Sequence, residues 1–342
     1  LFSKEHAVYK EINDTKALHV FEKRVRKVSP KYIGHWWKYA AVLLFPILVV
    51  GSWKLMHETV QTPVVVSSVA SVQPGCSQAV LVLDDGRKVF LKEEEEGVIS
   101  EDKEITVTGE KDRLVYTSSE GKNVDGIRFN ELEVPRGGEY KVKLADGTLV
   151  YLNSATRMKY PVKFDGKERK VYLSGEAYFE VRKDSLRPFI VRVNGAEVTV
   201  LGTSFNVNTY GDDGQIYTTL VNGSVRILSE KNGQEEVLTP GMQGVMNIQT
   251  GQLTVREVDV ESYVAWREGR FVFRTMTLDL IMHQLQRWYD FEVFYQNPEL
   301  KEYEFRGVIK RDMDLDKVLS VIKATTNVDF DVKGKVITII KR

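Results

Sequence analysis

Residues 141–153 read KVKLADGTLVYLN, two runs of alternating apolar and polar side chains joined by an Asp-Gly pair. Such alternation predicts half-buried strands, and Asp-Gly between two of them is a strong short-range signal for a hairpin. Residues 79–92, AVLVLDDGRKVFLK, repeat the pattern at an offset of 61, with Leu83 matching Leu144. Two copies predict a repeated β unit.

The region from residue 74 to residue 260 shows almost no helical periodicity. We predict further strands in it at residues 170–174, 177–182, 189–193, 197–201, 205–210, 216–221, 224–229, 236–239, 243–248 and 253–258. Many short strands separated by turn residues are typical of all-β architectures. Residues 74–260 are therefore predicted to form an all-β body, either a sandwich or a stacked β-roll.

From residue 270 onward, strands and helices alternate. We predict strands at residues 271–274, 291–295, 303–309, 328–332 and 336–340, and helices at residues 278–289 and 315–326. The two helix–strand units match at an offset of 37, with Thr277 and Asp314 as candidate N-caps. Residues 270–342 are therefore predicted to be a small two-layer α/β domain with a duplicated β-α-β unit.

The last predicted strand of this domain is a candidate for partner binding. We expect it to be an open edge of its sheet. Such an edge can pair with a strand of another protein. Its residues are Val336, Ile337, Thr338, Ile339 and Ile340.

Residues 39–53 read YAAVLLFPILVVGSW and carry no charged side chain. With snorkelling lysines at its ends, this stretch predicts a transmembrane helix over residues 39–56, followed by a linker over residues 57–73. Aromatic and basic side chains at both ends are typical of membrane–water interfaces. The predicted interface anchors are Trp36, Trp37, Lys38, Trp53 and Lys54.

The net charge of zero, from 48 basic and 48 acidic residues, conceals a polarity along the chain. Residues 1–38 carry nine Lys/Arg and four Asp/Glu, a net of +5, so residues 39–342 carry −5. The positive-inside rule places the N-terminus in the cytoplasm and the C-terminal part outside, in the periplasm of a Gram-negative cell. The basic, amphipathic N-terminal segment either lies on anionic lipid or binds a cytoplasmic partner. The overall balance argues against direct nucleic-acid binding.

No combination of residues indicates catalysis, a cofactor or a metal. Cys76 is the only cysteine, which excludes an intrachain disulfide and a thiolate zinc cluster. His283 is the only histidine after residue 60 and falls within a predicted helix, where a packed or surface role is expected. The protein is therefore predicted not to be an enzyme.

Two groups of carboxylates need a separate explanation. Glu176 and Glu180 lie four residues apart on a predicted strand, without a partner base, and are interpreted as structural. Asp312, Asp314 and Asp316 resemble the start of a calcium loop, but Lys317 occupies the position that requires glycine. Helix capping is the preferred explanation for these aspartates.

Five motifs follow in order along the β region: GGEYKVKLADGTLVYLNSATRMKYP (137–161), LSGEAYFEV (173–181), PFIVRVNGAEVTVLGTSFNV (188–207), TTLVNGSVRI (218–227) and LTPGMQGVMN (238–247). In order and spacing they resemble the FecR-type regulators, membrane-spanning sensors that act as anti-sigma factors. The C-terminal pattern resembles the short domain of secretins and TonB-dependent receptors, which also ends FecR-like proteins of Bacteroidota.

The resemblance implies a single-pass inner-membrane signal transducer that controls transcription. Its implied partners are a cytoplasmic ECF sigma factor, the periplasmic signalling domain of a TonB-dependent outer-membrane receptor, and a regulatory protease. Residues 1–38 would be the sigma-binding part, although the family usually has a longer unit there. The alternative is a membrane-anchored periplasmic module without sigma control, which binds a glycan or peptide on exposed Tyr151, Tyr160 and Tyr172.

Overall fold

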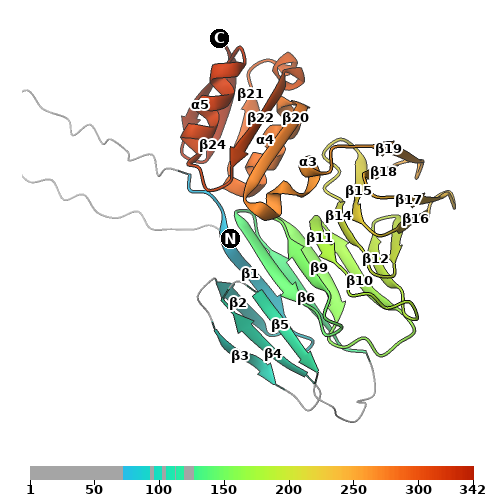
Figure 1. Cartoon of the computed structure of the whole chain (residues 1–342). Coiled ribbons are helices and arrows are strands. Elements are labelled where there is room, and N and C mark those ends of the chain that lie inside the picture. The colour runs from blue at the N-terminus through green and yellow to red at the C-terminus, as the bar shows by residue number, and fades with distance from the viewer. Residues whose placement is uncertain (1–71, 93–95, 102–104, 112, 119–126) are drawn as a thin grey trace, which may run out of the picture. The chain divides into compact units, whose positions relative to one another are not determined.

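The computed structural model describes residues 72–92, 96–101, 105–111, 113–118 and 127–342, all within the compact unit Ser67–Arg342 (Figure 1). The predicted cytoplasmic segment, the predicted transmembrane helix at residues 39–56 and most of the predicted linker lie outside these residues. Among the helices of the described part, none is long and apolar enough to cross a membrane.

The β body consists of two long layers of strands that share one apolar core and are joined by a short parallel pairing of their strands β1 and β7. Residues of both layers, such as Leu81 and Val142, are fully buried in the same cluster. The first layer has the order β2-β1-β6-β9-β10-β12-β13-β16-β17 and the second β3-β4-β5-β7-β8-β11-β14-β15-β18-β19. This arrangement confirms the predicted all-β character of the body.

The strands of the first layer are β1 (Cys76–Val82), β2 (Lys88–Lys92), β6 (Phe129–Val134), β9 (Thr156–Pro161), β10 (Arg169–Ser174), β12 (Phe189–Val193), β13 (Ala196–Val200), β16 (Val225–Ser229) and β17 (Glu235–Leu238). Those of the second are β3 (Gly97–Glu101), β4 (Ile105–Glu110), β5 (Arg113–Ser118), β7 (Gly138–Lys143), β8 (Leu149–Leu152), β11 (Glu176–Glu180), β14 (Ser204–Asn208), β15 (Gln215–Asn222), β18 (Met242–Asn247) and β19 (Leu253–Glu257).

Both Asp-Gly hairpins predicted from the sequence are present. Strand β1 pairs antiparallel with β2, and β7 pairs antiparallel with β8, with Val142 opposite Val150. Gly86 and Gly147 adopt φ values of 84° and 88° in the two turns. An L-residue with a side chain rarely adopts this left-handed conformation, so glycine fits both turns.

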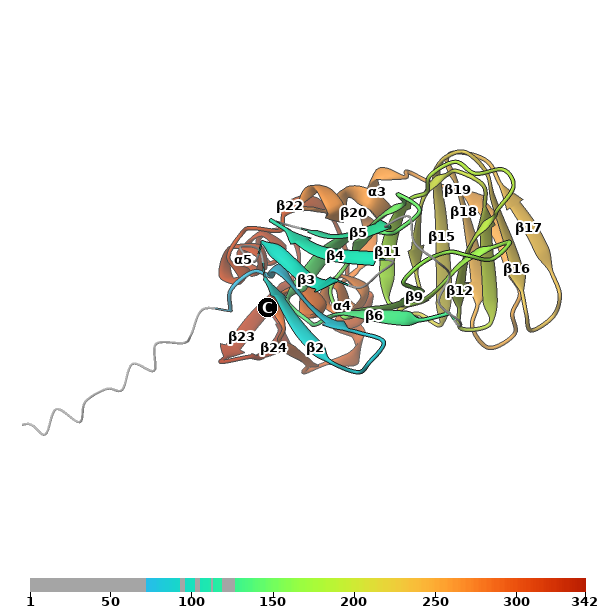
Figure 2. The same cartoon turned by 90° about the horizontal axis from the view of Figure 1, so that it is seen from below.

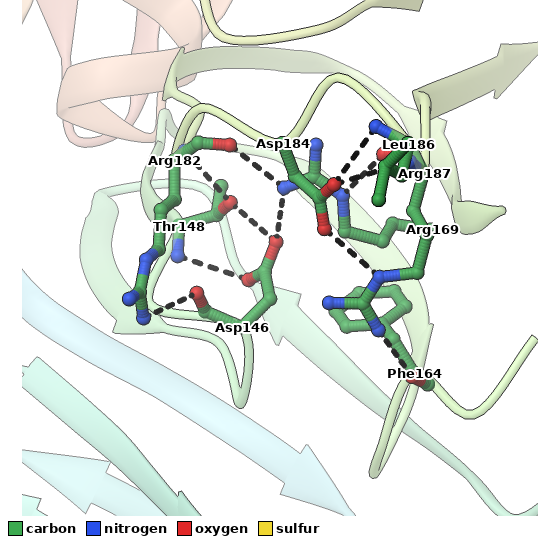
Figure 3. A network of polar contacts seen from close by, with 8 residues as sticks. All are labelled: Asp146, Thr148, Phe164, Arg169, Arg182, Asp184, Leu186 and Arg187. Atoms are coloured by element: carbon green, nitrogen blue, oxygen red, sulfur yellow. Dashed lines mark hydrogen bonds and ion pairs between the residues drawn. The ribbon is translucent and has the colours of Figure 1, made fainter. Parts of the chain in front are cut away.

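The second of these turns is tied to a distant loop by a buried ion pair (Figure 3). Asp146 accepts hydrogen bonds from the backbone and the hydroxyl of Thr148, and its Oδ2 lies 2.8 Å from Nη1 of Arg169. The Arg169 guanidinium also donates to the carbonyl oxygens of Arg182 and Arg187. Because both charged side chains are almost fully buried, these bonds compensate for their lost hydration.

The C-terminal domain has its own apolar core between two small sheets and two helices. Strands β20 and β22 form one sheet, and the order of the other is β21-β24-β23. Its elements, with the preceding connection, are α3 (Glu261–Val264), η1 (Ala265–Glu268), β20 (Arg270–Thr277), α4 (Leu278–Tyr289), β21 (Glu292–Tyr295), η2 (Pro298–Glu302), β22 (Glu304–Lys310), α5 (Leu315–Thr325), β23 (Val328–Lys333) and β24 (Val336–Lys341).

The predicted edge strand, Val336–Ile340, is not an edge. It falls in β24, which pairs in parallel with β21 on one side and antiparallel with β23 on the other. Ile337 and Ile339 are fully buried, because the central strand of a covered sheet gives its apolar side chains to the core. The edges of this sheet are β21 and β23.

The two predicted N-caps occupy the expected positions but do not act through their side chains. Thr277 and Asp314 precede α4 and α5, and neither side chain makes a capping hydrogen bond. Instead, the Asp314 carboxylate lies 2.9 Å from the ammonium group of Lys317. This pair lies within one helical turn and is exposed, so it contributes little to stability.

Candidate functional site

Arg311 joins the C-terminal domain to the β body. It directly follows β22, and its side chain is only 2% exposed. Its guanidinium stacks on the Trp288 ring of α4, with 3.7 Å between the guanidinium carbon and the ring centroid. One terminal nitrogen donates to the carbonyl of Trp266, and the other donates to Oδ1 of Asn153 in the β body at 2.9 Å. We call this contact region between the body and the domain the junction.

A continuous hydrogen-bond chain extends from Arg311 into the β body. The Asn153 amide donates to one oxygen of the Glu176 carboxylate at 2.7 Å, and the Asn206 amide donates to the other at 2.9 Å. Asn206 in turn accepts a bond from the indole N–H of Trp266 at 3.2 Å. This hydrogen-bond chain therefore begins on Arg311 of the C-terminal domain and ends on Trp266 of η1, whose carbonyl accepts a bond from Arg311.

The charged side chains of this hydrogen-bond network are buried, and burial shifts their pKa values. Burial raises the pKa of Glu176, while the amides of Asn206 and Asn153 oppose that shift. Burial also lowers the pKa of Arg311, and the carboxylate of Glu139, 3.3 Å away, opposes that shift. A buried network of this kind is stable only while its members keep their partners.

Two further arginines bridge the same surfaces through aromatic rings. Arg287 of α4 lies over the Tyr210 ring at 3.8 Å and pairs with Asp212 at 2.8 Å. Arg267 of η1 lies over the Tyr178 ring at 4.3 Å. Cation–π contacts of desolvated arginines add up to about 2 kcal/mol each, so they supplement the bonds of Arg311.

The segment that leads into β1 is held in the same junction. Val72 packs against the apolar core of the C-terminal domain. Gly75 lies so close to Trp288 that a Cβ there would come within 2.6 Å of the indole ring. The amide of Cys76 donates to the carbonyl of Gly137, whose own amide donates to the carbonyl of Arg287 in α4. We call residues 72–76 the connecting segment.

Comparison with known proteins identifies the family. The family model described as FecR protein matches residues 130–226, and the one described as FecR, C-terminal matches residues 270–339. Two crystal structures of a candidate anti-sigma factor from Parabacteroides distasonis are each 31% identical to the chain, with a TM-score of 0.58. The alignments cover 62% and 63% of this chain and 99% of the solved chains. Among curated proteins, none matches the chain.

The chain belongs to the FecR-like anti-sigma factors. This confirms the family inferred from the five motifs, and it supports a role as a sigma regulator. The first matched region covers much of the β body, and the second covers most of the C-terminal domain. The junction therefore lies between two regions that are both characteristic of FecR-like proteins.

The glutamates predicted to be structural in this FecR-like chain have different surroundings. Glu176 is 8% exposed and lies at the centre of the junction network. Glu180 lies at its margin, 3.4 Å from the guanidinium of Arg267. Both act through hydrogen bonds and ion pairs to neighbouring side chains, in agreement with the structural interpretation.

Other residues considered in the sequence lie apart from the junction network or outside the described part. His283 lies on the surface of α4, 3.9 Å from Asp279, and Cys76 is an exposed free thiol. The predicted membrane anchors Trp36, Trp37, Lys38, Trp53 and Lys54 lie outside the described residues. Within the described part, no three His, Cys, Asp or Glu side chains are placed to hold a metal ion.

The aromatic platform of the alternative function is not formed. Tyr160 is fully buried, and its hydroxyl lies 3.0 Å from that of Tyr116. Tyr151 packs edge-on against Tyr178, and only Tyr172 is substantially exposed. The alternation of these residues along their strands serves core and cross-strand packing instead.

Arg311, Trp266 and Trp288 were not predicted as site residues. A single arginine after a strand normally has a solvated side chain. Trp266 falls in the connection before residue 270, and Trp288 falls on the apolar face of the predicted helix at residues 278–289. Burial of all three arises from contacts between segments that are far apart in the sequence. One signal that the sequence does offer is Gly75, since glycine permits close approach and a Cβ there would come within 2.6 Å of the Trp288 ring.

Proposed function

We propose that this FecR-like protein is a single-pass inner-membrane signal transducer, with its N-terminus in the cytoplasm and its C-terminus in the periplasm. In this proposal it relays a signal from the signalling domain of a TonB-dependent outer-membrane receptor to a cytoplasmic ECF sigma factor. Family membership supports the sigma-factor side, and the charge asymmetry of the sequence supports the orientation.

The observation that carries the relay is the position of the connecting segment. Residues 72–76 follow the predicted span and include the last two residues of the predicted linker, and they contact Trp288 of α4 directly through Gly75. The same Trp288 is covered by Arg311 and donates its indole N–H to the Arg311 carbonyl at 2.8 Å. A change in the C-terminal domain can therefore reach the segment on the membrane side without passing through the whole β body.

The energetics of such a relay follow from the junction. A partner that binds the undocked C-terminal domain more tightly than the docked one shifts the population toward undocking by that difference in affinity. Undocking exposes Arg311, Trp266 and Glu176 to water together, because one network contains all three. The transition is then two-state, which suits a signal that must be either on or off.

Co-purification of the full chain from its native membranes tests the proposal. An affinity-tagged full chain is expected to retain an ECF sigma factor and a TonB-dependent receptor, both identified by mass spectrometry. An unrelated tagged single-span protein, expressed at the same level, should retain neither. Recovery of no sigma factor from cells that express the chain at its natural level would contradict the sigma-factor arm. Absence of the receptor alone would contradict only the receptor arm.

A further inference from the structure

A cleft of about 450 Å³ lies beside the junction. One wall is the length of β20 from Arg270 to Thr277, with part of α4. The other is formed by the loop between β14 and β15, by Tyr217 of β15 and by Arg256 of β19. In both views α3 lies between β20 and the group β15, β18 and β19 (Figures 1 and 2). This volume is typical of sites for small ligands or short peptide segments.

The wall formed by β20 has an unpaired edge. Among the described strands, only β22 pairs with β20, so the opposite edge of β20 has no strand partner. A strand paired on one side directs alternate N–H and C=O groups to its other edge. Such an edge accepts an extended peptide as an additional strand.

The strand is irregular where it borders the cleft. Its pairing with β22 shifts register between Phe273 and Met276, and Thr275 has a φ of 55°. A left-handed conformation is unusual for a β-branched residue and costs about 1–3 kcal/mol. Strain of this kind is found disproportionately at binding sites, and Thr275 itself lines the cleft.

Two buried polar atoms of cleft-lining residues have no hydrogen-bond partner among the described residues. They are Oγ of Ser262 and Nε of Arg311. Both can donate a hydrogen bond, so both are suited to a carbonyl or carboxylate acceptor. Leaving such a donor buried without a partner costs about 1–3 kcal/mol, which a ligand with acceptor groups would recover.

One arginine of the cleft favours an acidic ligand. Five arginines and three carboxylates line the cleft, but four of these arginines already pair with carboxylates of the described residues, which leaves Arg256. Arg256 donates two hydrogen bonds to the neutral Gln243 side chain, and no carboxylate of the described residues lies within ion-pair distance of it. An incoming carboxylate would therefore be the first charged partner of Arg256.

We propose that this cleft binds an extended acidic segment of a partner protein. The segment adds a strand to the free edge of β20 and places a carboxylate beside Arg256. The inference rests on the cleft alone and does not require the sigma-factor relay, since peptide binding is measurable without either proposed partner.

Isothermal titration calorimetry with the purified full chain in detergent tests the inference. The probes are three capped pentapeptides of valine and threonine: one with a central glutamate, one with a central lysine, and one with a central glutamate flanked by prolines. The glutamate peptide is expected to bind at least about tenfold more tightly than the lysine peptide. The proline peptide is expected not to bind, because proline lacks the N–H that a strand donates.

Variants assign the binding to the cleft. Arg256→Glu is expected to reverse the preference between the glutamate and lysine peptides. Arg226→Glu, a control at an exposed arginine of β16, should leave the preference unchanged. Hydrogen exchange of the wild-type chain provides a measurement independent of variant folding, with protection of residues 270–277 expected on addition of the glutamate peptide.

Several results would overturn the inference. These are equal or absent binding of all three peptides, an unchanged preference in Arg256→Glu, or no protection of β20. Binding of free succinate as tight as that of the glutamate peptide would identify a small-anion site instead. Recovery of a sigma factor in the co-purification would be unaffected by any of these results, so the two proposals fail separately.

Discussion

The guanidinium carbon of Arg311 lies 3.7 Å from the centroid of the Trp288 ring, and the Trp288 indole N–H donates to the Arg311 carbonyl. This reciprocal contact joins the residue after β22 to α4, and both residues are almost fully buried. Each also contacts a third segment, Arg311 through Asn153 and Trp288 through Gly75. One pair thus connects the C-terminal domain, the β body and the connecting segment.

Replacing Asn206 with aspartate should destabilise the junction more than any surface change of the same kind. Asn206→Asp places a second carboxylate against Glu176, and two adjacent buried carboxylates cannot both ionise. We expect a loss of about 3 kcal/mol in the free energy of unfolding near neutral pH, measured by urea denaturation. Asn222→Asp makes the same replacement at an exposed position and should change the free energy little.

Glu176 predicts a specific pH dependence of stability. Because burial raises its pKa above the ordinary value of 4.5, the folded chain binds more protons than the unfolded chain between the two values. The contribution of Glu176 to stability is therefore greatest below about pH 4.5 and is lost as the pH rises through the raised pKa. Glu176→Gln should lack this loss.

The relevant measurement is the difference in unfolding free energy between wild type and Glu176→Gln from about pH 4 to about pH 8. Other titrating groups are common to both chains and cancel in the difference. A difference that stays constant over this range would show that Glu176 does not titrate with a raised pKa.

Gly75 is expected to tolerate no side chain. In Gly75→Ala the new Cβ would come within 2.6 Å of the Trp288 ring and 2.9 Å of the Gly137 carbonyl oxygen. One of these groups has to move, so we expect faster hydrogen exchange in α4 and the connecting segment. Gly166→Ala is the matched control, since its Cβ would meet no atom closer than 3.7 Å. Equal exchange in the two variants would show that the connecting segment is not tightly packed.

Arg169 provides a test within the β body. Arg169→Met leaves the buried Asp146 carboxylate without its charged partner, and we expect a loss of about 3–5 kcal/mol in unfolding free energy. Arg192→Met removes a more exposed ion pair, with Glu230, and should cost less than about 1 kcal/mol. Similar losses in both variants would mean that burial of the Asp146–Arg169 pair does not determine its importance.

Much of the secondary structure could be predicted because it depends on local pattern. Alternation and Asp-Gly turns located the hairpins, and the predicted helix at residues 278–289 coincides with α4. The position of strand 336–340 could not be predicted, since its place in the sheet depends on a parallel pairing with β21, far away in sequence. Sequence periodicity shows that a strand is apolar, and it does not show which neighbours the strand has.

The junction was beyond prediction for a related reason. Glu176 was recognised as a structural residue, but its partners Asn153 and Asn206 come from separate strands and turns. Arg311 has no local feature that distinguishes it from a solvated arginine. Its burial results from the docking of the C-terminal domain, which brings together Trp288, Trp266 and Asn153.

The central claim is that the C-terminal domain controls the connecting segment through Arg311. Hydrogen exchange of the full chain, compared between wild type, Arg311→Met and Arg192→Met, tests it most directly. We expect faster exchange of residues 72–82 in Arg311→Met and wild-type exchange there in Arg192→Met. Unchanged exchange of residues 72–82 in Arg311→Met, together with faster exchange around residue 311, would contradict it.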